Sequence, residues 1–206
     1  MLITSGPDPD TTAKTGYARG RVKRRQILEA ATAVFADVGF NGASLREIAA
    51  RAGISHPGLL HHFPTKPALL EAVLKHRDEV DTTAFDADIA RGVSKFEALL
   101  LLAERNQQRR PLVELFMAVG AEATSPAHPA HEYFVNRYEQ AVSFFREWFE
   151  SEELRAGLQP EDAARHMVAL MDGLQVQWLM SLGGPPEREV DMAACLRSYL
   201  HLVLPA

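Results

Sequence analysis

The sequence predicts an all-α protein in which an N-terminal three-helix domain with a helix-turn-helix precedes a longer helical C-terminal domain. Three observations predict this class. Apolar residues recur at the three- and four-residue intervals of a buried helix face. Proline, glycine and short polar clusters divide the chain into segments of helical length. No segment alternates strictly between apolar and polar residues, as a half-buried strand would.

The first element should be a helix over residues 21–38, preceded by a disordered tail over residues 1–18. The tail is polar and rich in Gly, Pro and Thr, a composition typical of disorder. It lacks the basic start and apolar core of a signal peptide. Gly39 stands where the helix should end. The apolar face of this helix consists of Ile27, Ala31, Val34 and Val38.

Residues 44–66, SLREIAARAGISHPGLLHHFPTK, are expected to form two short helices and a tight turn. Ser44 and Glu47 have the spacing of a capping box, which starts a helix. Gly53 suits the left-handed conformation that ends a helix, and Ser55 can cap the next one. A helix, a glycine turn and a second helix with a polar side form a helix-turn-helix, whose second helix enters the DNA major groove.

The rest of the chain should be helical as well. A fourth helix should run from Lys66 to about Val80, because Thr65 can cap it. The acidic and weakly patterned residues 81–92 are interpreted as a loop or a frayed helix. Further helices are expected over residues 94–109, 111–123, 129–155, 160–182 and 189–204.

Residues 20–75 resemble the DNA-binding domain of the TetR family of bacterial transcriptional regulators. The order and spacing of helix, turn, helix and closing F-P-x-K carry the resemblance. The matching residues are Phe35, Gly39, Phe40, Ser44 to Gly53, Ile54, Ser55, Leu59, His62, Phe63, Pro64, Lys66, Leu69 and Leu70. The resemblance implies a DNA-binding domain over residues 19–66 and a ligand-binding and dimerisation domain over residues 67–206.

By the same resemblance, the chain is expected to be a cytoplasmic homodimeric repressor that binds a double-stranded DNA operator and is released by a small-molecule effector. A regulator of this architecture that activates, or that has no ligand response, is the alternative. A basic N-terminal part on an acidic body fits a DNA-binding protein. Residues 1–66 carry nine Lys/Arg and five Asp/Glu, whereas the remainder carries thirteen and twenty-two. The basic cluster at residues 19–25 is either a solvated helix start or a phosphate contact, and both can hold.

The resemblance also implies which residues touch DNA. Arg46 should read guanine, because a guanidinium can bond O6 and N7 together. Ser44 and Lys66, at helix starts, should hold phosphates. The family usually has a tyrosine where this chain has Leu60. A leucine cannot hydrogen-bond a phosphate, so Leu60 should instead pack inward or meet a thymine methyl group. The expected DNA-contacting residues are Ser44, Arg46, His56, Pro57, Gly58, His61, His62 and Lys66.

The body combines aromatic residues, several methionines and few polar groups. Soft and adaptable side chains of this kind suit a pocket for an apolar or aromatic small molecule, although aromatics at helical spacing are more often core residues. The expected pocket residues are Phe116, Met117, Tyr138, Phe145, Met171, Gln175 and Trp178.

The last two helices carry apolar faces that a second subunit should cover, as in the resembled family. Burial of both faces within one chain is the alternative. These faces consist of Met167, Leu170, Met171, Leu174, Trp178 and Leu179 on one helix and Met192, Cys195, Leu196, Tyr199, Leu200 and Val203 on the other.

Other classes of protein find no support in the sequence. There is no nucleophile elbow, phosphate-binding glycine loop or His/Cys ligand set, so we expect neither an enzyme nor a cofactor. His61 and His62 are adjacent and point apart, and His128 and His131 lack a third ligand, which argues against a metal. No apolar run is long enough to span a membrane. Asp172, inside an apolar helix, is interpreted as a satisfied buried aspartate.

Overall fold

Short polar side chains fix where the helices of the N-terminal part begin. In the computed structural model, which describes the backbone of residues 9–204 and side chains from residue 20 onward, three such caps follow one another. Ser44, Ser55 and Thr65 each accept a hydrogen bond from the backbone N–H three residues later, at 3.1–3.2 Å. Between the first two caps, Gly53 takes a left-handed φ of 65° and turns the chain.

The described residues contain helices, turns and bends but no strand, as the sequence predicts. The α-helices are α1 (Pro9–Gly42), α2 (Leu45–Arg51), α3 (His56–His62), α4 (Lys66–Ala90), α5 (Lys95–Gln107), α6 (Arg110–Glu122), α7 (His131–Glu150), α8 (Pro160–Ser181) and α9 (Met192–Val203), with a short 3₁₀ helix, η1 (Pro186–Arg188). No helix among residues 9–204 is both long and apolar enough to cross a membrane.

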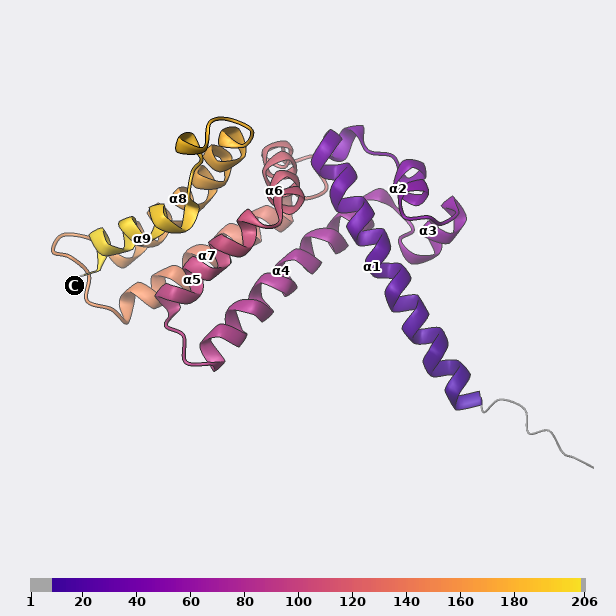
Figure 1. Ribbon diagram of the computed structural model, residues 1–206, viewed down its shortest axis with the longest axis horizontal. Helices are drawn as coiled ribbons and strands as arrows, with labels where there is room; N and C mark the ends of the chain where they lie inside the picture. The colour runs from indigo at the N-terminus through magenta and orange to yellow at the C-terminus, as the bar shows by residue number, and fades with distance from the viewer. Residues whose placement is uncertain (1–8, 205–206) are drawn as a thin grey trace, which may run out of the picture.

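Helices α1 to α3 form a head, and α5 to α9 form a body (Figure 1). Helix α4 runs from the head along the body and so connects the two. In the body, α7 packs along α8 and α5 packs along α9. Helix α6 packs against α1, so the body touches the head directly as well as through α4.

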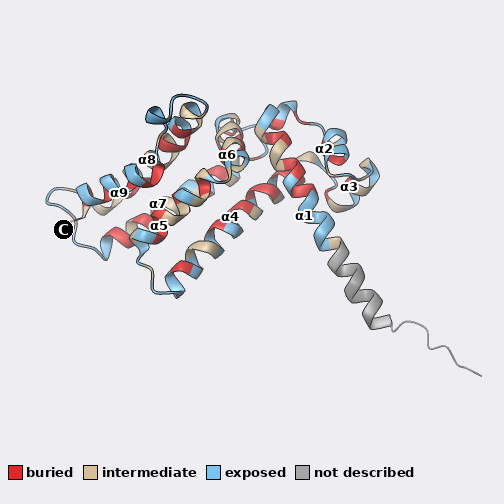
Figure 2. Cartoon of the chain, in the orientation of Figure 1, coloured by how far each residue is buried: buried red, intermediate tan, exposed pale blue. Residues whose placement is uncertain are grey.

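Two hydrophobic clusters hold this arrangement together. Their buried residues are among those coloured red in Figure 2. The first joins the head to the start of α4, to most of α6 and to the start of α7, with Phe35, Leu69 and Phe116 among its buried residues. The second joins α5, the end of α7, α8 and α9 around Phe149 and Met167. The first cluster therefore extends past residue 66, where the sequence analysis divides the chain.

Helix α1 begins earlier than predicted. The expected tail over residues 1–18 is helical from Pro9, and residues 1–8 lie outside the described part of the chain. Proline is a favourable first residue of a helix, because it has no N–H that would need an acceptor there. The predicted break at Gly39 is present as a kink with φ 68°, after which one more turn follows.

Helix α4 continues to Ala90, so the interpretation of residues 81–92 as a loop or frayed helix is wrong. Two of the three acids that made this stretch look solvated, Asp81 and Asp88, are paired and buried. Asp88 is fully buried and bonds both Arg91 and Arg105. Such pairing offsets the cost of burying a carboxylate, which sequence patterning cannot reveal.

The remaining helix ends differ from the predictions by a few residues. Helix α7 ends at Glu150 rather than at residue 155, and α9 starts at Met192 because Asp191 caps it by accepting from Ala194 N at 3.0 Å.

Candidate functional site

The exposed polar surface of the head comes from α2, from α3 and from the turns that start them. Of the residues predicted to touch DNA, half are exposed and half are partly buried. The exposed ones are Ser44, Arg46, Pro57 and His61, and the partly buried ones are His56, Gly58, His62 and Lys66. The fully buried Leu59 anchors α3 to the core of the head, so the polar side of this helix faces outward.

Gly58 occupies a crowded place in the first turn of α3. A Cβ atom there would lie 3.1 Å from Ser55 Oγ, the oxygen that caps this helix. Its lack of a side chain therefore serves the cap, in addition to any close approach to DNA. Leu60 is partly buried, so its exposure fits both alternatives, inward packing and contact with a thymine methyl group.

Lys66 has a structural role that the sequence analysis missed. Its ammonium donates to the carbonyls of Phe40 at 2.7 Å and Ala43 at 2.9 Å, approaches that of Asn41 at 3.5 Å, and lies 4.5 Å from the centroid of the Phe40 ring. An ammonium has three protons, so these carbonyls use its donors. Lys66 therefore ties the start of α4 to the end of α1, and the phosphate contact expected of it stays a prediction.

The basic cluster of α1, around Arg24, lies next to the end of α3. Arg24 stacks over the ring of Phe63, with 5.1 Å from its guanidinium carbon to the ring centroid. Arg21, Lys23 and Arg25 are exposed beside it. A guanidinium held at the end of α3 places positive charge beside the expected recognition helix, where it can attract a phosphate backbone.

The last residue of α6 contacts α1 at its kink. Glu122 Oε2 accepts from the backbone N–H of Phe40 at 2.9 Å and lies 3.4 Å from His128 Nε2. The same carboxylate leaves no room for a Cβ at Gly39. The buried His128 ring meets the Phe40 ring edge-on at 5.0 Å. The chain around Phe40 is thus held by Glu122 on one side and by Lys66 on the other.

A cavity of about 390 Å³ lies in the body, walled by α4, α5, α6, α7 and α8. Its volume falls within the range of about 300–1,000 Å³ that is common for small-molecule sites. It is lined by Arg77, Asp78, Asp81, Thr82, Phe85, Asp86, Leu99, Leu102, Asn106, Phe116, Arg137, Tyr138, Gln140, Ala141, Phe144, Phe145, Val168, Met171, Asp172 and Gln175.

Five of the seven residues predicted to bind a ligand line this cavity: Phe116, Tyr138, Phe145, Met171 and Gln175. Met117 and Trp178 do not. Met117 packs between the two hydrophobic clusters, and Trp178 is only 2% exposed inside the second. An apolar side chain fills a core or lines a cavity depending on its angular position on the helix, so these two residues lie in the core, and their ligand contact stays a prediction.

A charged network that the sequence did not predict packs against Phe116 in the cavity wall. Arg77 and Arg137 stack on the Phe116 ring, at 4.1 and 4.9 Å from its centroid. Asp78 accepts from Arg137 at 2.9 Å and from Tyr133. Burial, followed by the nearby Arg137, lowers the pKa of Arg77, and burial raises the pKa of Tyr133. The only sequence signal was the presence of charged residues at inward positions of α4.

On the α8 side, Asp172 Oδ2 accepts from the Tyr138 hydroxyl at 2.6 Å. Burial raises the pKa of this carboxyl, against the hydrogen bond from Tyr138 and the charges of Arg137 and Arg77, which lower it. One turn further along α8, Gln175 is 6% exposed, and its Oε1 has no hydrogen-bond partner within the described part of the chain. Asp172 thus has a hydrogen-bond partner, as interpreted, but it is partly rather than fully buried.

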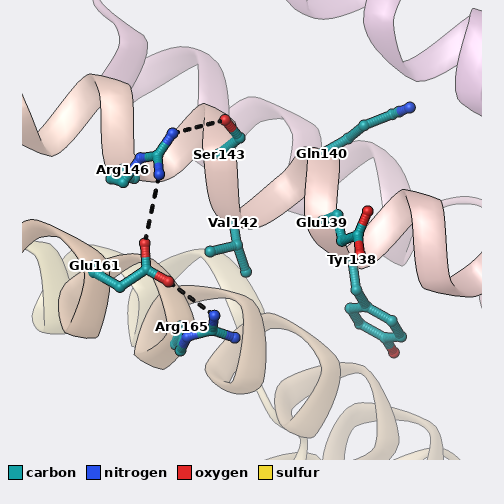
Figure 3. Close-up of a pocket in the computed structure, with 8 residues that line it drawn as sticks. All are labelled: Tyr138, Glu139, Gln140, Val142, Ser143, Arg146, Glu161 and Arg165. Carbon is teal, nitrogen blue, oxygen red and sulfur yellow. Dashed lines mark hydrogen bonds and ion pairs between the residues drawn. The ribbon is translucent and has the colours of Figure 1, made fainter.

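A second hollow lies on the outer side of α7 and α8 (Figure 3). Arg146 bonds Ser143 at 3.2 Å and pairs with Glu161 at 3.9 Å, and Glu161 pairs with Arg165 at 2.8 Å. These charged side chains satisfy one another across the two helices. The arrangement joins α7 to α8.

The apolar faces expected to form a dimer interface are largely buried within the chain. Leu196 is 2% exposed and Leu200 is fully buried, so neither can meet a second subunit. The buried members of the expected faces are Met167, Leu174, Trp178, Met192, Leu196, Leu200 and Val203. A different apolar surface remains open. It consists of Ala169, Gly173, Val176 and Met180 on α8 and Leu202 on α9, and is called the α8–α9 stripe below.

The histidines have neighbours other than metals. His131 Nδ1 lies 2.9 Å from the carbonyl of Ala123, and His128 Nδ1 accepts from Ala130 N at 3.2 Å. Within the described residues, no three His, Cys, Asp or Glu side chains gather as a metal site would require.

Comparison with known proteins covers both the head and the body. Residues 27–73 match the sequence model described as bacterial regulatory proteins, tetR family. Residues 96–205 match the model described as the C-terminal part of BetI-type transcriptional repressors. The second match alone spans more than half of the 206 residues.

Individual proteins resemble the chain over different lengths. It is 39% identical over 94 residues to the transcriptional activator FasR of Mycolicibacterium smegmatis, covering 46% of this chain and 38% of FasR. It is 45% identical over 65 residues to the transcriptional regulator RutR of Escherichia coli K12, covering 32% and 30%. The matches thus span about a third of these relatives. The solved structure of Salmonella enterica GusR aligns with a TM-score of 0.67 and 27% identity over 88% of this chain and 95% of that one.

Proposed function

The chain belongs to the TetR family of bacterial regulatory proteins, and from that premise we propose that it is a homodimeric repressor whose operator binding is released by a small molecule. The membership makes it a DNA-binding transcriptional regulator rather than an enzyme. The observation that carries the proposal is the capped helix-turn-helix, with exposed Arg46 and the polar side of α3, joined through α4 and α6 to a body with a ligand-sized cavity.

Repression is favoured over activation by the body. The match to BetI-type repressors covers more of the chain than the match to the activator FasR does. Activation is the second candidate, and the name of FasR is the observation that favours it. A reporter gene placed behind the operator distinguishes them: deletion of the regulator raises its transcription under repression and lowers it under activation.

The dimer should form through the α8–α9 stripe. Met180 is 82% exposed and Leu202 is 65% exposed, which is unusual for large apolar side chains. A second subunit packed on the stripe would bury them. A Cβ at Gly173 would meet nothing within 4 Å, so there is room for a neighbouring helix to approach. Two heads related by a twofold axis could then enter successive major grooves, about 34–36 Å apart.

Operator binding is tested by selecting sites from random DNA and measuring affinity across a salt series. We expect a palindromic consensus, and a logarithm of affinity that falls with the logarithm of salt by about 0.9 for each phosphate neutralised. Failure to enrich any sequence, or binding that is insensitive to salt, would contradict the proposal.

A further inference from the structure

Charge balance in the body cavity indicates what kind of ligand it takes. Its lining holds four aspartates and two arginines. Asp78 and Asp81 are paired with Arg77, and each has a second arginine partner, Arg137 for Asp78 and Arg109 for Asp81. The two lining guanidiniums are therefore already neutralised by carboxylates, and they also stack on Phe116. A negatively charged ligand would find no uncompensated cation here.

Asp172 is the exception among the inward carboxylates. It forms no ion pair within the described part of the chain, and Tyr138 is its one hydrogen-bond donor there. A carboxylate can accept several hydrogen bonds through its two oxygens, so Asp172 has capacity left. Asp86, exposed on α4, adds a further unpaired carboxylate to the cavity lining.

Gln175 lies on the same face of α8 as Asp172, three residues later. Among the described residues, its Oε1 is an acceptor without a partner, on a residue more than nine-tenths buried in the cavity wall. Leaving such a group unsatisfied is costly, and a donor on the ligand would remove that cost. Asp172 and Gln175 together thus present acceptors and call for N–H donors.

The walls around these acceptors are aromatic. Phe85 of α4 meets Phe144 of α7 edge-on at 5.7 Å, and Phe144 meets Phe145 at 5.3 Å. Aromatic faces attract cations and also accept apolar groups. The Phe116 face is taken by two guanidiniums, so these other rings are the ones open to a ligand.

We propose that the cavity binds a protonated primary amine attached to an aromatic or apolar body, whose ammonium donates to Asp172 and Gln175. This inference rests on the proposed function, because it names the chemical class of the effector for the same cavity. The acceptors lie at the α8 wall, and the aromatic residues of α4 and α7 would hold the apolar body.

Four probes of similar shape test the charge and the donors by calorimetry: 2-phenylethylamine, 2-phenylethanol, 3-phenylpropionate and trimethyl(2-phenylethyl)ammonium. We expect the amine to bind at least tenfold more tightly than each of the other three. Preference for the carboxylate, equal binding of the alcohol or the quaternary ion, or no binding of the amine at millimolar concentration would overturn the proposal.

Two variants test the residues. Asp172→Asn should weaken amine binding at least tenfold and leave binding of the alcohol unchanged, because only the amine carries a charge. Gln175→Met, which keeps the length of the side chain but removes the acceptor, should weaken the amine about threefold to tenfold. Glu161→Gln, in the outer hollow on the same helix, is the matched control and should change neither. Unchanged amine binding in Asp172→Asn would overturn the assignment.

Operator binding tests the proposed function separately from the ligand class. Asp172→Asn and Gln175→Met should retain the operator affinity of the wild type, because both residues lie in the body. If the amine does not bind while another probe binds and releases the operator, the proposed ligand class is wrong and the proposed regulatory function is kept. If no operator binding exists, the regulator is wrong, and the calorimetric result still decides the chemistry of the cavity.

Discussion

At the scale of single residues, side chains of one type serve different purposes, and only their surroundings tell them apart. Lys66 and Arg46 are both basic residues of the head. The ammonium of Lys66 is used by backbone carbonyls, whereas Arg46 is exposed on α2 and has no acceptor within the described residues. We therefore expect Arg46 to act on DNA and Lys66 to act on the fold.

Replacing Arg46 by alanine should cost about 1–3 kcal/mol on the best operator and relax the preference at one base pair per half-site, because a bidentate contact to guanine is lost. Binding measured on a set of single-substitution operators gives both quantities. Arg51→Ala, the same change on the exposed last turn of α2, is the control and should leave the preference intact. A loss equal on every sequence would mean that Arg46 touches only phosphate.

Replacing Lys66 by methionine should lower the free energy of unfolding by about 1–3 kcal/mol, because the carbonyls of Phe40 and Ala43 lose a charged donor. Chemical denaturation followed by circular dichroism measures this. Lys75→Met, on the exposed side of the same helix, removes only a surface pair with Glu71 and should cost well under about 1 kcal/mol. Equal stability of the two variants would contradict the structural role of Lys66.

Amine binding should weaken as the pH falls, because it needs ionised Asp172. Burial raises the pKa of this carboxyl, while the hydroxyl of Tyr138 and the charges of Arg137 and Arg77 oppose the rise. A bound cation favours the ionised form, so affinity is full above the raised pKa and is lost as the pH drops through it. The loss should therefore centre above the ordinary aspartate value of 3.8, and Asp172→Asn should abolish it.

At the scale of elements, amphipathic helices divide their apolar residues between the core and the surface. The inner sides of α8 and α9 fill the second hydrophobic cluster, and the α8–α9 stripe remains outside it. Helix α4 divides its charged residues in the same way, since its buried aspartates bind arginines of α5 and of the loop that follows α5. Which side of a helix faces a partner is therefore set by packing around it.

A charge placed on the stripe should separate the subunits. Val176→Glu puts a carboxylate where a second α8 should pack, and an unpaired buried charge is costly. Sedimentation should then show monomers, and operator affinity should fall because each head acts alone. Val135→Glu on α7 is the matched control, since Val135 is 38% exposed and Val176 is 37% exposed. Dimers that survive Val176→Glu would exclude the stripe as the interface.

At the scale of the whole molecule, the cavity and the DNA-binding face are connected through two routes. Arg77 and Asp78 belong to α4, whose first residue holds the end of α1. Phe116 belongs to α6, whose last residue, Glu122, holds the N–H of Phe40. A ligand that shifts either helix would therefore move the same turn of the head.

We expect the effector to weaken operator binding by about 5–150-fold, and the operator to weaken effector binding by the same factor. Glu122→Gln should reduce this factor, because a neutral amide holds the Phe40 N–H less strongly than a carboxylate does. The coupling is measured by titrating each ligand in the presence of the other, with the tightest-binding of the four probes. Glu114→Gln on the same helix, which removes only a pair with Arg110, is the control. Equal factors in both variants would exclude Glu122 as a route.

The sequence by itself determined the helix class, most helix positions and the helix-turn-helix, because caps such as Ser44, Ser55 and Thr65 and glycine turns such as Gly53 act within a few residues of chain. It also predicted five of the residues that line the cavity, since apolar and aromatic residues at inward positions have few other places to lie.

Only the tertiary structure decided which apolar residues line the cavity, which fill the core and which remain outside. Met117 and Trp178 are core residues, and Leu196 is buried where an interface was expected. The pairing of Asp88 with Arg105 and the hold of Lys66 on Phe40 join segments distant along the chain. Such contacts depend on how helices pack, and helical periodicity reports only that a face is apolar, not which neighbour covers it.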